Sequence, residues 1–220
     1  MFEESNHPKI SVLIPVYNVE KYVRRCLFSV LNQTMQEGVE VIIVNDCTPD
    51  HSMEEIFEAL RAYSGNERGE KMSVRVVNHD TNHGLAVVRN TAMNYATGDY
   101  VIHVDSDDWI DLDMFKFLYE LLETEEADIS ICSHYIERSG RTKIKYNSDE
   151  VLNLVPRDAM RLLVEDDIIR NFAWDKLYRR TLFRELRFPQ GRYFEDIAVM
   201  YKVFYQARKI VMKGHPKYHY

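Results

Sequence analysis

Four aspartates gather just after a short apolar stretch, in the segment YVIHVDSDDWID at residues 100–111. Asp105 and Asp107 are separated by one residue, so both carboxylates can turn toward one point where a strand ends. Carboxylate oxygens, together with substrate phosphates, are the ligands that Mg²⁺ favours. Asp and Ser also form Asx-turns and helix caps, so the motif alone leaves both roles open. We expect Asp108 and Asp111 to cap a helix that starts near residue 112.

Another acid, Asp46, ends the apolar segment EVIIVND at 40–46. A carboxylate at this point can accept a hydrogen bond from an imide N–H or a hydroxyl of a ligand. Asp46 could instead cap the helix expected to follow, although Asp50 suits that role better.

Gly84 opens a predicted helix whose first backbone N–H groups are free to bind an anion. Arg89 lies near the middle of this helix, among small apolar residues. Its side chain either lies along the surface or clamps a ligand. The motifs G-x-G-x-x-G and G-x-x-x-x-G-K-[ST] are both absent, which argues against a nicotinamide-dependent dehydrogenase and a P-loop NTPase.

A second acidic pair, Glu195-Asp196, lies in the aromatic segment GRYFEDIAVMYKV. A carboxylate beside an apolar pocket is the usual general base for activating a hydroxyl. The pair could equally start a helix at 195–207, and the two roles are compatible. The segment WDKLY at 174–178 could form an aromatic and charged wall for a polyol, or anchor the edge of a sheet.

These side chains need a scaffold that brings distant segments together. Apolar, β-rich runs predict strands at 9–17, 40–46, 74–79, 100–105 and 127–138. Helical periodicity predicts helices at 20–36, 51–63, 84–96 and 112–123. The alternation predicts an α/β fold with a mostly parallel, Rossmann-like central sheet flanked by helices. Ligands then bind beyond the carboxyl ends of the strands, where the polar residues lie.

The rhythm changes after about residue 140. GRTKIKYNSDE predicts an exposed hairpin or loop, and PRDAMRLLVEDD predicts a helix. This later part is expected to form a smaller region beside the main sheet.

The composition narrows the function classes. The chain has 220 residues, a net charge of −7 and 45% hydrophobic residues, which predicts a sizeable core and argues against nucleic-acid binding. Three cysteines without short spacing, Cys26, Cys47 and Cys132, indicate reduced thiols and a cytoplasmic location. The polar N-terminus is not typical of a signal peptide, and no apolar run is long enough to span a bilayer.

Taken together and in order, several segments resemble the inverting family 2 glycosyltransferases of GT-A fold. The matching pieces are SVLIPVYNVEKYV, VIIVNDCTPD, NHGLAVVRNTAMNYATGDYVIHVDSDDWI, WDKLYRRTLF and FEDIAVMYKV. They cover about residues 9–220. The resemblance implies transfer of a sugar from a nucleotide-diphosphate donor, expected to be a UDP-sugar, to a hydroxyl of a glycan or a lipid-linked acceptor.

The resemblance also implies roles for individual residues. Asp196 matches the general base. The predicted nucleotide-sugar contacts are Pro15, Val16, Tyr17, Asn18, Glu20, Asp46, Arg89, Asp105, Ser106 and Asp107. Tyr17 is the candidate to stack on the base. Mn²⁺ or Mg²⁺ is expected on Asp107, with Asp105 and His219 as further metal contacts. Trp174, Lys176 and Glu195 are expected on the acceptor side.

Two departures from the family pattern matter. Cys47-Thr48 replaces the usual glycine-serine after Asp46, and the chain ends at YHY, where relatives often continue. We therefore expect the native chain to extend beyond Tyr220 and to include an acceptor-side or membrane-docking part, with peripheral contact at the inner face of the membrane left open. Residues 1–110 would form the nucleotide-sugar-binding half, and residues 111–220 the acceptor-side half of the same GT-A domain.

Two other functions compete with this interpretation. A nucleotidyltransferase is also an α/β enzyme with metal-binding carboxylates, but it usually has a glycine-rich basic loop where this chain has PVYNVEKY. A non-catalytic protein that binds a sugar nucleotide would have little need for Asp105, Asp107 and Asp196 together.

Overall fold

The computed structural model describes residues 7–64, 72–138 and 140–220. Strands form at the apolar, β-rich runs, as predicted, and further strands follow in the second half. They are β1 (Ile10–Val16), β2 (Val39–Asn45), β3 (Ser73–Asn78), β4 (Tyr100–His103), β5 (Trp109–Ile110), β6 (Ile129–Arg138), β7 (Arg141–Ile144), β8 (Val151–Leu154), β9 (Lys176–Arg179) and β10 (Ile210–His219).

In the first half of the chain each strand is followed by a helix up to β4, whereas in the second half several strands follow one another without a helix between them. The helices are α1 (Val23–Leu31), α2 (Ser52–Ser64), α3 (Leu85–Tyr95), α4 (Met114–Thr124), α5 (Pro156–Glu165) and α6 (Ile197–Gln206). The polar segment SGNERGEK at 64–71, whose composition predicts a loop, lies almost wholly outside the described residues. None of the described helices combines the length and the apolar character needed to cross a membrane.

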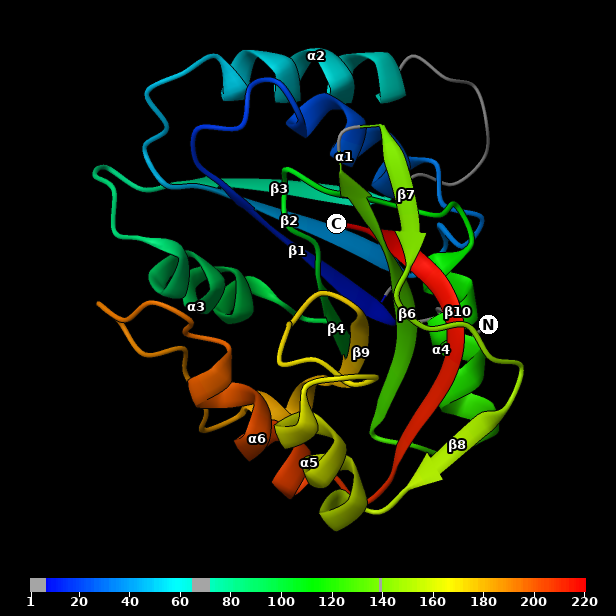
Figure 1. Cartoon of the computed structure of the whole chain (residues 1–220). Coiled ribbons are helices and arrows are strands. Elements are labelled where there is room, and N and C mark those ends of the chain that lie inside the picture. Colours follow the sequence, from blue (N-terminus) through cyan, green and yellow to red (C-terminus); the bar gives the residue numbers. More distant parts are fainter. Residues whose placement is uncertain (1–6, 65–71, 139) are drawn as a thin grey trace, which may run out of the picture.

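One twisted sheet runs through both halves of the chain, in the order β3-β2-β1-β4-β9-β6-β10-β5 (Figure 1). The first four strands in this order are parallel to one another. β9 lies antiparallel between β4 and β6, and β10 pairs with β6 in parallel. The prediction of an α/β fold with a mostly parallel central sheet is confirmed. The assignment of a donor half and an acceptor half stays a prediction.

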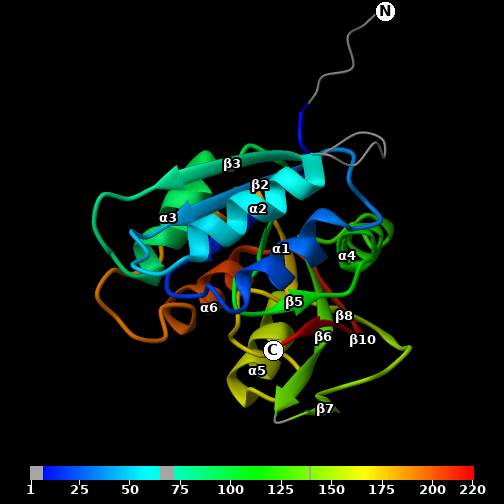
Figure 2. The same cartoon turned by 90° about the horizontal axis from the view of Figure 1, so that it is seen from above.

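Helices cover both faces of the sheet (Figure 2). Alternate residues of β1 point to opposite faces, as a strand requires: Val12 and Ile14 pack in one core and Leu13 in the other. The first core includes buried residues of α1, α2 and α4, and the second includes those of α3, α5 and α6. The near-continuous apolar strands in the sequence reflect this burial on both sides.

A buried acid fixes the turn between α3 and β4. Glu40 accepts hydrogen bonds from Ser11 Oγ (2.6 Å), Thr97 N (2.7 Å) and Gly98 N (3.1 Å). A Cβ atom on Gly98 would lie 2.8 Å from Ser11 Oγ and 2.9 Å from Ser11 N, so only glycine fits there. This turn directs β4, and the acids that follow it, toward the edge of the sheet.

Two local predictions need correction, and a third is confirmed. The first helix, Val23–Leu31, is shorter than 20–36, and after its end the Gln33 side chain donates to the carbonyl of Asp111 (2.7 Å). Asp108 and Asp111 do not cap α4: its N-cap residue is Asp113, which makes no side-chain cap bond. The hairpin predicted after residue 140 is confirmed, since β7 pairs antiparallel with β6.

Candidate functional site

A cavity of about 420 Å³ lies at the carboxyl ends of β1, β2 and β4, the edge predicted to bind a ligand. Its lining comes from four separate segments: Pro15, Val16, Tyr17, Val19, Asp46, Asn82, Gly84, Leu85, Val88, Asp105, Ser106 and Asp107. Most of the predicted nucleotide-sugar contacts are therefore brought together. Asn18, Glu20 and Arg89 are not in the lining.

Asn18 and Glu20 support the cavity from behind. Asn18 has a positive φ of 58°, and its N–H donates to Thr48 Oγ1 (2.8 Å). A carboxylate oxygen of Glu20 accepts from His51 N (3.1 Å), and Glu20 N donates to Asp50 (2.9 Å). These bonds tie the loop after β1 to the loop after β2.

Asp50 is the cap that the sequence predicted for α2. One of its oxygens accepts from Ser52 N (3.1 Å), Ser52 Oγ (2.5 Å) and Thr48 Oγ1 (2.7 Å). Burial acts to raise the pKa of Asp50, but the bonds from Ser52 and Thr48 outweigh it and lower the pKa to about 2.

Asp46 is only 1% exposed and already holds the loop that precedes α3. Its carboxylate lies 2.7 Å from His79 Nδ1 and accepts from His83 N (2.9 Å) and Gly84 N (2.7 Å). Gly84 has a φ of 86°, which glycine adopts without strain. The predicted hydrogen bond from a ligand's imide group to Asp46 stays a prediction. The His79 contact was not foreseen from the sequence, because His79 belongs to a different strand end.

The acids after β4 form a tight turn with unequal environments. Tyr218 Oη accepts a hydrogen bond from Asp105 N (3.0 Å) and donates one to Asp108 Oδ2 (2.9 Å). Burial, with the charges of Asp105 and Asp107, raises the pKa of Asp108 to about 8. Asp107 points outward into the cavity, and partial burial together with the charge of Asp105 raises its pKa. Asp108 is thus a buried structural acid, whereas Asp107 is open to a ligand.

Arg89 lies behind the cavity wall and joins two acids from distant segments. Its guanidinium donates from Nη2 to Asp105 Oδ1 (3.0 Å) and from Nη1 to Glu195 Oε1. Arg89 is 3% exposed and Glu195 is 8% exposed. The Glu195 carboxylate neutralises the buried guanidinium of α3, and its predicted position on the acceptor side stays a prediction.

Asp196, next to Glu195, is the N-cap residue of α6, and its side chain accepts from Ile197 N (2.9 Å). Burial raises the pKa of Asp196, while the Arg89 guanidinium opposes that rise. A carboxylate with a raised pKa is a better proton acceptor than an ordinary exposed aspartate. The two roles proposed for this residue, helix start and base, are compatible in the structure.

The predicted acceptor wall is not on the surface. Trp174 is 2% exposed and stacks on Tyr218 at 4.1 Å between ring centroids. Lys176 has no exposed surface, and its ammonium donates to Arg170 O (2.9 Å), Phe172 O (2.8 Å) and Asp175. Both residues are structural anchors, as the sequence allowed, but β9 lies between β4 and β6 inside the sheet and not at its edge. Neither presents its side chain to an acceptor.

His219 pairs with two acids from other segments. Its ring nitrogens contact Glu137 Oε1 (3.0 Å) and Asp111 Oδ1 (3.1 Å). Its ring stacks between Trp109 and Tyr135, at centroid distances of 4.6 and 4.3 Å. Burial acts to lower its pKa, but the two acids outweigh burial and raise it. Both ring nitrogens are thus paired in the structure, and the role of His219 as a metal contact stays a prediction.

Asp105 and Asp107 could hold a cation that takes only one or two of its ligands from the protein. Within the described ranges, no group of three or more His, Cys, Asp or Glu side chains could hold a metal by itself. Mg²⁺ usually binds one or two carboxylates and takes its other ligands from water and substrate phosphates. Asp107 and its partly exposed neighbour Asp105 line a cavity with room for those ligands. The donor set therefore fits a cation that arrives with a phosphorylated ligand.

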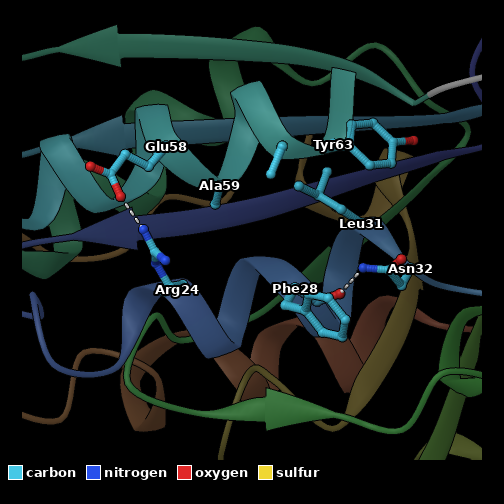
Figure 3. Close-up of a pocket in the computed structure, with 8 residues that line it drawn as sticks. Arg24, Phe28, Leu31, Asn32, Glu58, Ala59 and Tyr63 are labelled. Carbon is cyan, nitrogen blue, oxygen red and sulfur yellow. Dashed lines mark hydrogen bonds and ion pairs between the residues drawn. The ribbon is translucent and has the colours of Figure 1, made fainter. Parts of the chain in front are cut away.

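A second hollow lies between α1 and α2 and has a mostly apolar lining (Figure 3). Phe28, Leu31 and Tyr63 line it with apolar surface. Its charged residues, Arg24 and Glu58, pair with each other. It offers no unpaired acid for a cation.

The sequence did not single out the exposed aromatic residues beside Asp196. Tyr193 is 95% exposed and Phe194 is 74% exposed, and Phe194 adopts a φ of 57°. A left-handed conformation is unusual for an aromatic residue and occurs preferentially at functional sites. The aromatic residues of RYFED were the only sign in the sequence that could have pointed to them. Their exposure depends on the conformation of the loop, which the sequence does not specify.

The comparisons with known proteins agree with this geometry. The family model described as Glycosyl transferase family 2 matches residues 11–187. Glycosyltransferase GlyA of Streptococcus pneumoniae is 34% identical over 96% of this chain and 30% of its own length. The putative glycosyltransferase EpsH of Bacillus subtilis is 34% identical over 97% of this chain and 60% of its own length. The chain thus spans only part of each relative.

Solved structures share the fold. Residues 1–349 of Staphylococcus aureus TarS superpose with a TM-score of 0.80 and 26% identity, covering 96% of this chain and 60% of that one. A mannosyltransferase from Pyrobaculum calidifontis, solved with GDP-Man and Mn²⁺, has a TM-score of 0.68 at 19% identity over 96% of this chain and 56% of that one, which shows the fold alone. With most of its length matched by the family model, this chain belongs to glycosyl transferase family 2.

Proposed function

We propose that the chain transfers a sugar from a UDP-sugar to a hydroxyl of a glycan or lipid-linked acceptor, with inversion at the anomeric carbon. The observation that carries this proposal is the cavity where Asp105 and Asp107 face the space expected for a diphosphate. The loop that holds Asp196 is tied to the same cavity through Arg89. Family membership supports the class of reaction.

Three features support the donor side. Tyr17 is 47% exposed at the cavity wall and can stack on a base. Related TarS, named as a poly(ribitol-phosphate) β-N-acetylglucosaminyltransferase, is 28% identical to this chain, and its structure has been solved with UDP-GlcNAc. Helix α3 starts at Leu85 on the cavity wall, and the positive end of its dipole favours an anion there, although the N–H groups of His83 and Gly84 already bind Asp46.

Asp107 and Asp105 would hold Mn²⁺ or Mg²⁺. When bound, such a cation neutralises the diphosphate and stabilises it as a leaving group. Burial and, after it, the charge of Asp105 raise the pKa of Asp107, and a positive ligand would relieve the repulsion between these two carboxylates.

Asp196 acts as the general base in the proposed reaction. Its carboxylate takes the proton of the acceptor hydroxyl, and the acceptor oxygen forms a bond to the anomeric carbon. The bond from that carbon to the diphosphate oxygen breaks on the opposite face, and the nucleoside diphosphate leaves. A single displacement of this kind inverts the configuration. Tyr193 and Phe194, exposed beside Asp196, are the side chains placed to contact the acceptor.

The test is a thermal-shift panel of nucleoside diphosphates with and without Mn²⁺, followed by transfer assays with the matching sugar nucleotides. We expect UDP with Mn²⁺ to raise the melting temperature most, because the diphosphate and the cation bind together. Stabilisation by a nucleoside triphosphate, with release of pyrophosphate, would instead indicate a nucleotidyltransferase. Binding of UDP-sugars without any hydrolysis or transfer would indicate a non-catalytic binding protein.

A further inference from the structure

Arg89 is shared by two carboxylates that belong to different parts of the proposed site. Asp105 lies 16 residues away in sequence, at the donor cavity, and Glu195 lies 106 residues away, beside Asp196. Removing one partner of a buried ion pair is strongly unfavourable, because a buried charge is left without compensation. The positions of these two acids are therefore linked through one guanidinium.

Asn90, the residue after Arg89, holds the other end of the loop that leads to Asp196. Asn90 Nδ2 donates to Phe188 O (2.8 Å), and Phe188 N donates to Asn90 Oδ1 (2.8 Å). The Arg89 guanidinium also lies over the Phe188 ring, 5.5 Å from its centroid. Between the buried residues Phe188 and Glu195, residues 190–194 are all exposed. Two consecutive residues of α3 thus hold both ends of the loop that leads to Asp196.

We propose that Arg89 is a positioning residue which couples occupancy of the donor cavity to the placement of Asp196. A cation bound at Asp105 attracts that carboxylate and weakens its hold on Arg89. The guanidinium is then left to Glu195, and the loop is held more firmly. The inference rests on the proposed function, since it needs a charged ligand beside Asp105. Because such coupling is reciprocal, loosening the loop also weakens donor binding.

Hydrogen–deuterium exchange of the 188–196 segment tests this coupling without using activity. In the parent, UDP with Mn²⁺ is expected to slow exchange of the segment. Arg89→Lys keeps the charge but loses the two-armed geometry, and Glu195→Gln keeps the shape but loses the charge. Each is expected to speed exchange of the segment about 10-fold without ligand, as expected for loss of one charge-assisted hydrogen bond. Each is also expected to abolish the slowing by UDP with Mn²⁺.

A double variant and a matched control separate positioning from general destabilisation. Arg89→Lys with Glu195→Gln is expected to be no worse than either change alone, in loop exchange and in kcat, because both break one interaction. Asp128→Asn removes an arginine-paired carboxylate at the other end of the strands. It is expected to lower stability and leave exchange of the 188–196 segment unchanged.

The failures can be told apart. If Arg89→Lys and Glu195→Gln both leave loop exchange at the parental rate, or if their effects add, the coupling is rejected. A parent that is stabilised by UDP with Mn²⁺ but shows no slowing of the loop also rejects it. Absence of any thermal shift with UDP and Mn²⁺ rejects the proposed function, and the coupling with it.

Discussion

The candidate site and the amino end of β6 hold acids whose pKa values are shifted in opposite directions. At the candidate site, the pKa of Asp107 and that of Asp196 are both raised by burial. At the amino end of β6, Asp128 accepts hydrogen bonds from Arg208 N (2.8 Å), Arg208 Nη2 (2.8 Å) and Arg179 Nε (3.0 Å). Burial acts to raise the pKa of Asp128 as well, but the bonds from Arg208 and Arg179 outweigh it, and the pKa is lowered.

The difference separates acids that stabilise the fold from acids that are free to bind a ligand. Asp128 and Asp50 have protein donors around them, so their ionised forms favour the native state. Asp107 and Asp196 lack comparable donors, and their charge is best compensated by something that binds. Perturbed carboxylates in a cavity are candidates for function for this reason.

Asp107→Asn is expected to have the largest effect on sugar transfer and donor binding. Transfer and stabilisation by UDP with Mn²⁺ are expected to fall to background, because one of two cation-binding carboxylates is lost. The melting temperature of the free protein should not fall, since the change removes repulsion with Asp105. Transfer assays and thermal shift give the two readings. A variant that is destabilised yet still responds to UDP with Mn²⁺ would place Asp107 with the structural acids.

Asp196→Asn should separate binding from chemistry. An amide cannot accept the acceptor proton, so transfer is expected to fall by about 10²–10⁴-fold. Donor binding, measured by calorimetry with UDP and Mn²⁺, should stay near the parental value. Transfer at the parental rate would show that another group is the base.

Asp128→Asn should show the reverse pattern. The amide loses the charge that holds Arg208 and Arg179, which is expected to cost about 1–2 kcal/mol, the low range for bonds to charged groups because Arg208 is mostly exposed. Urea denaturation at neutral pH measures the loss. Since the native pKa is lowered, this stabilisation is present above the unfolded pKa and disappears as the pH falls through the native value. If Asp128→Asn left stability unchanged, or weakened donor binding, Asp128 would not be an acid that serves only the fold.

The smallest expected effect is on Asp50→Ala, at the start of α2. Loss of a helix cap is expected to cost about 1 kcal/mol. The native pKa is about 2 and the usual value is 3.8, so the difference from the parent should be full above about pH 4. It should shrink as the pH falls toward about 2. A difference that does not change with pH would mean that the Asp50 charge is not the source of the stabilisation.

Much of the fold follows from local pattern. Runs such as SVLIPVY and EVIIVND specify buried parallel strands, and the alternation with helices specifies an α/β sheet with one polar edge. The clustering of Asp46, Asp105 and Asp107 at that edge was predictable for the same reason. The antiparallel insertion of β9 between β4 and β6 was not, because its short strand, Lys176–Arg179, carries no distinctive periodicity.

By itself, the sequence determined which residue types reach the ligand-binding edge and which family the chain resembles. Only the tertiary structure decided which acids are already paired. It paired Glu195 with Arg89, enclosed Lys176 among backbone carbonyls and placed His219 between Asp111 and Glu137. The physical reason is that a buried polar group must find its partner wherever packing brings one. That partner can lie about half the chain away, beyond the reach of any local pattern.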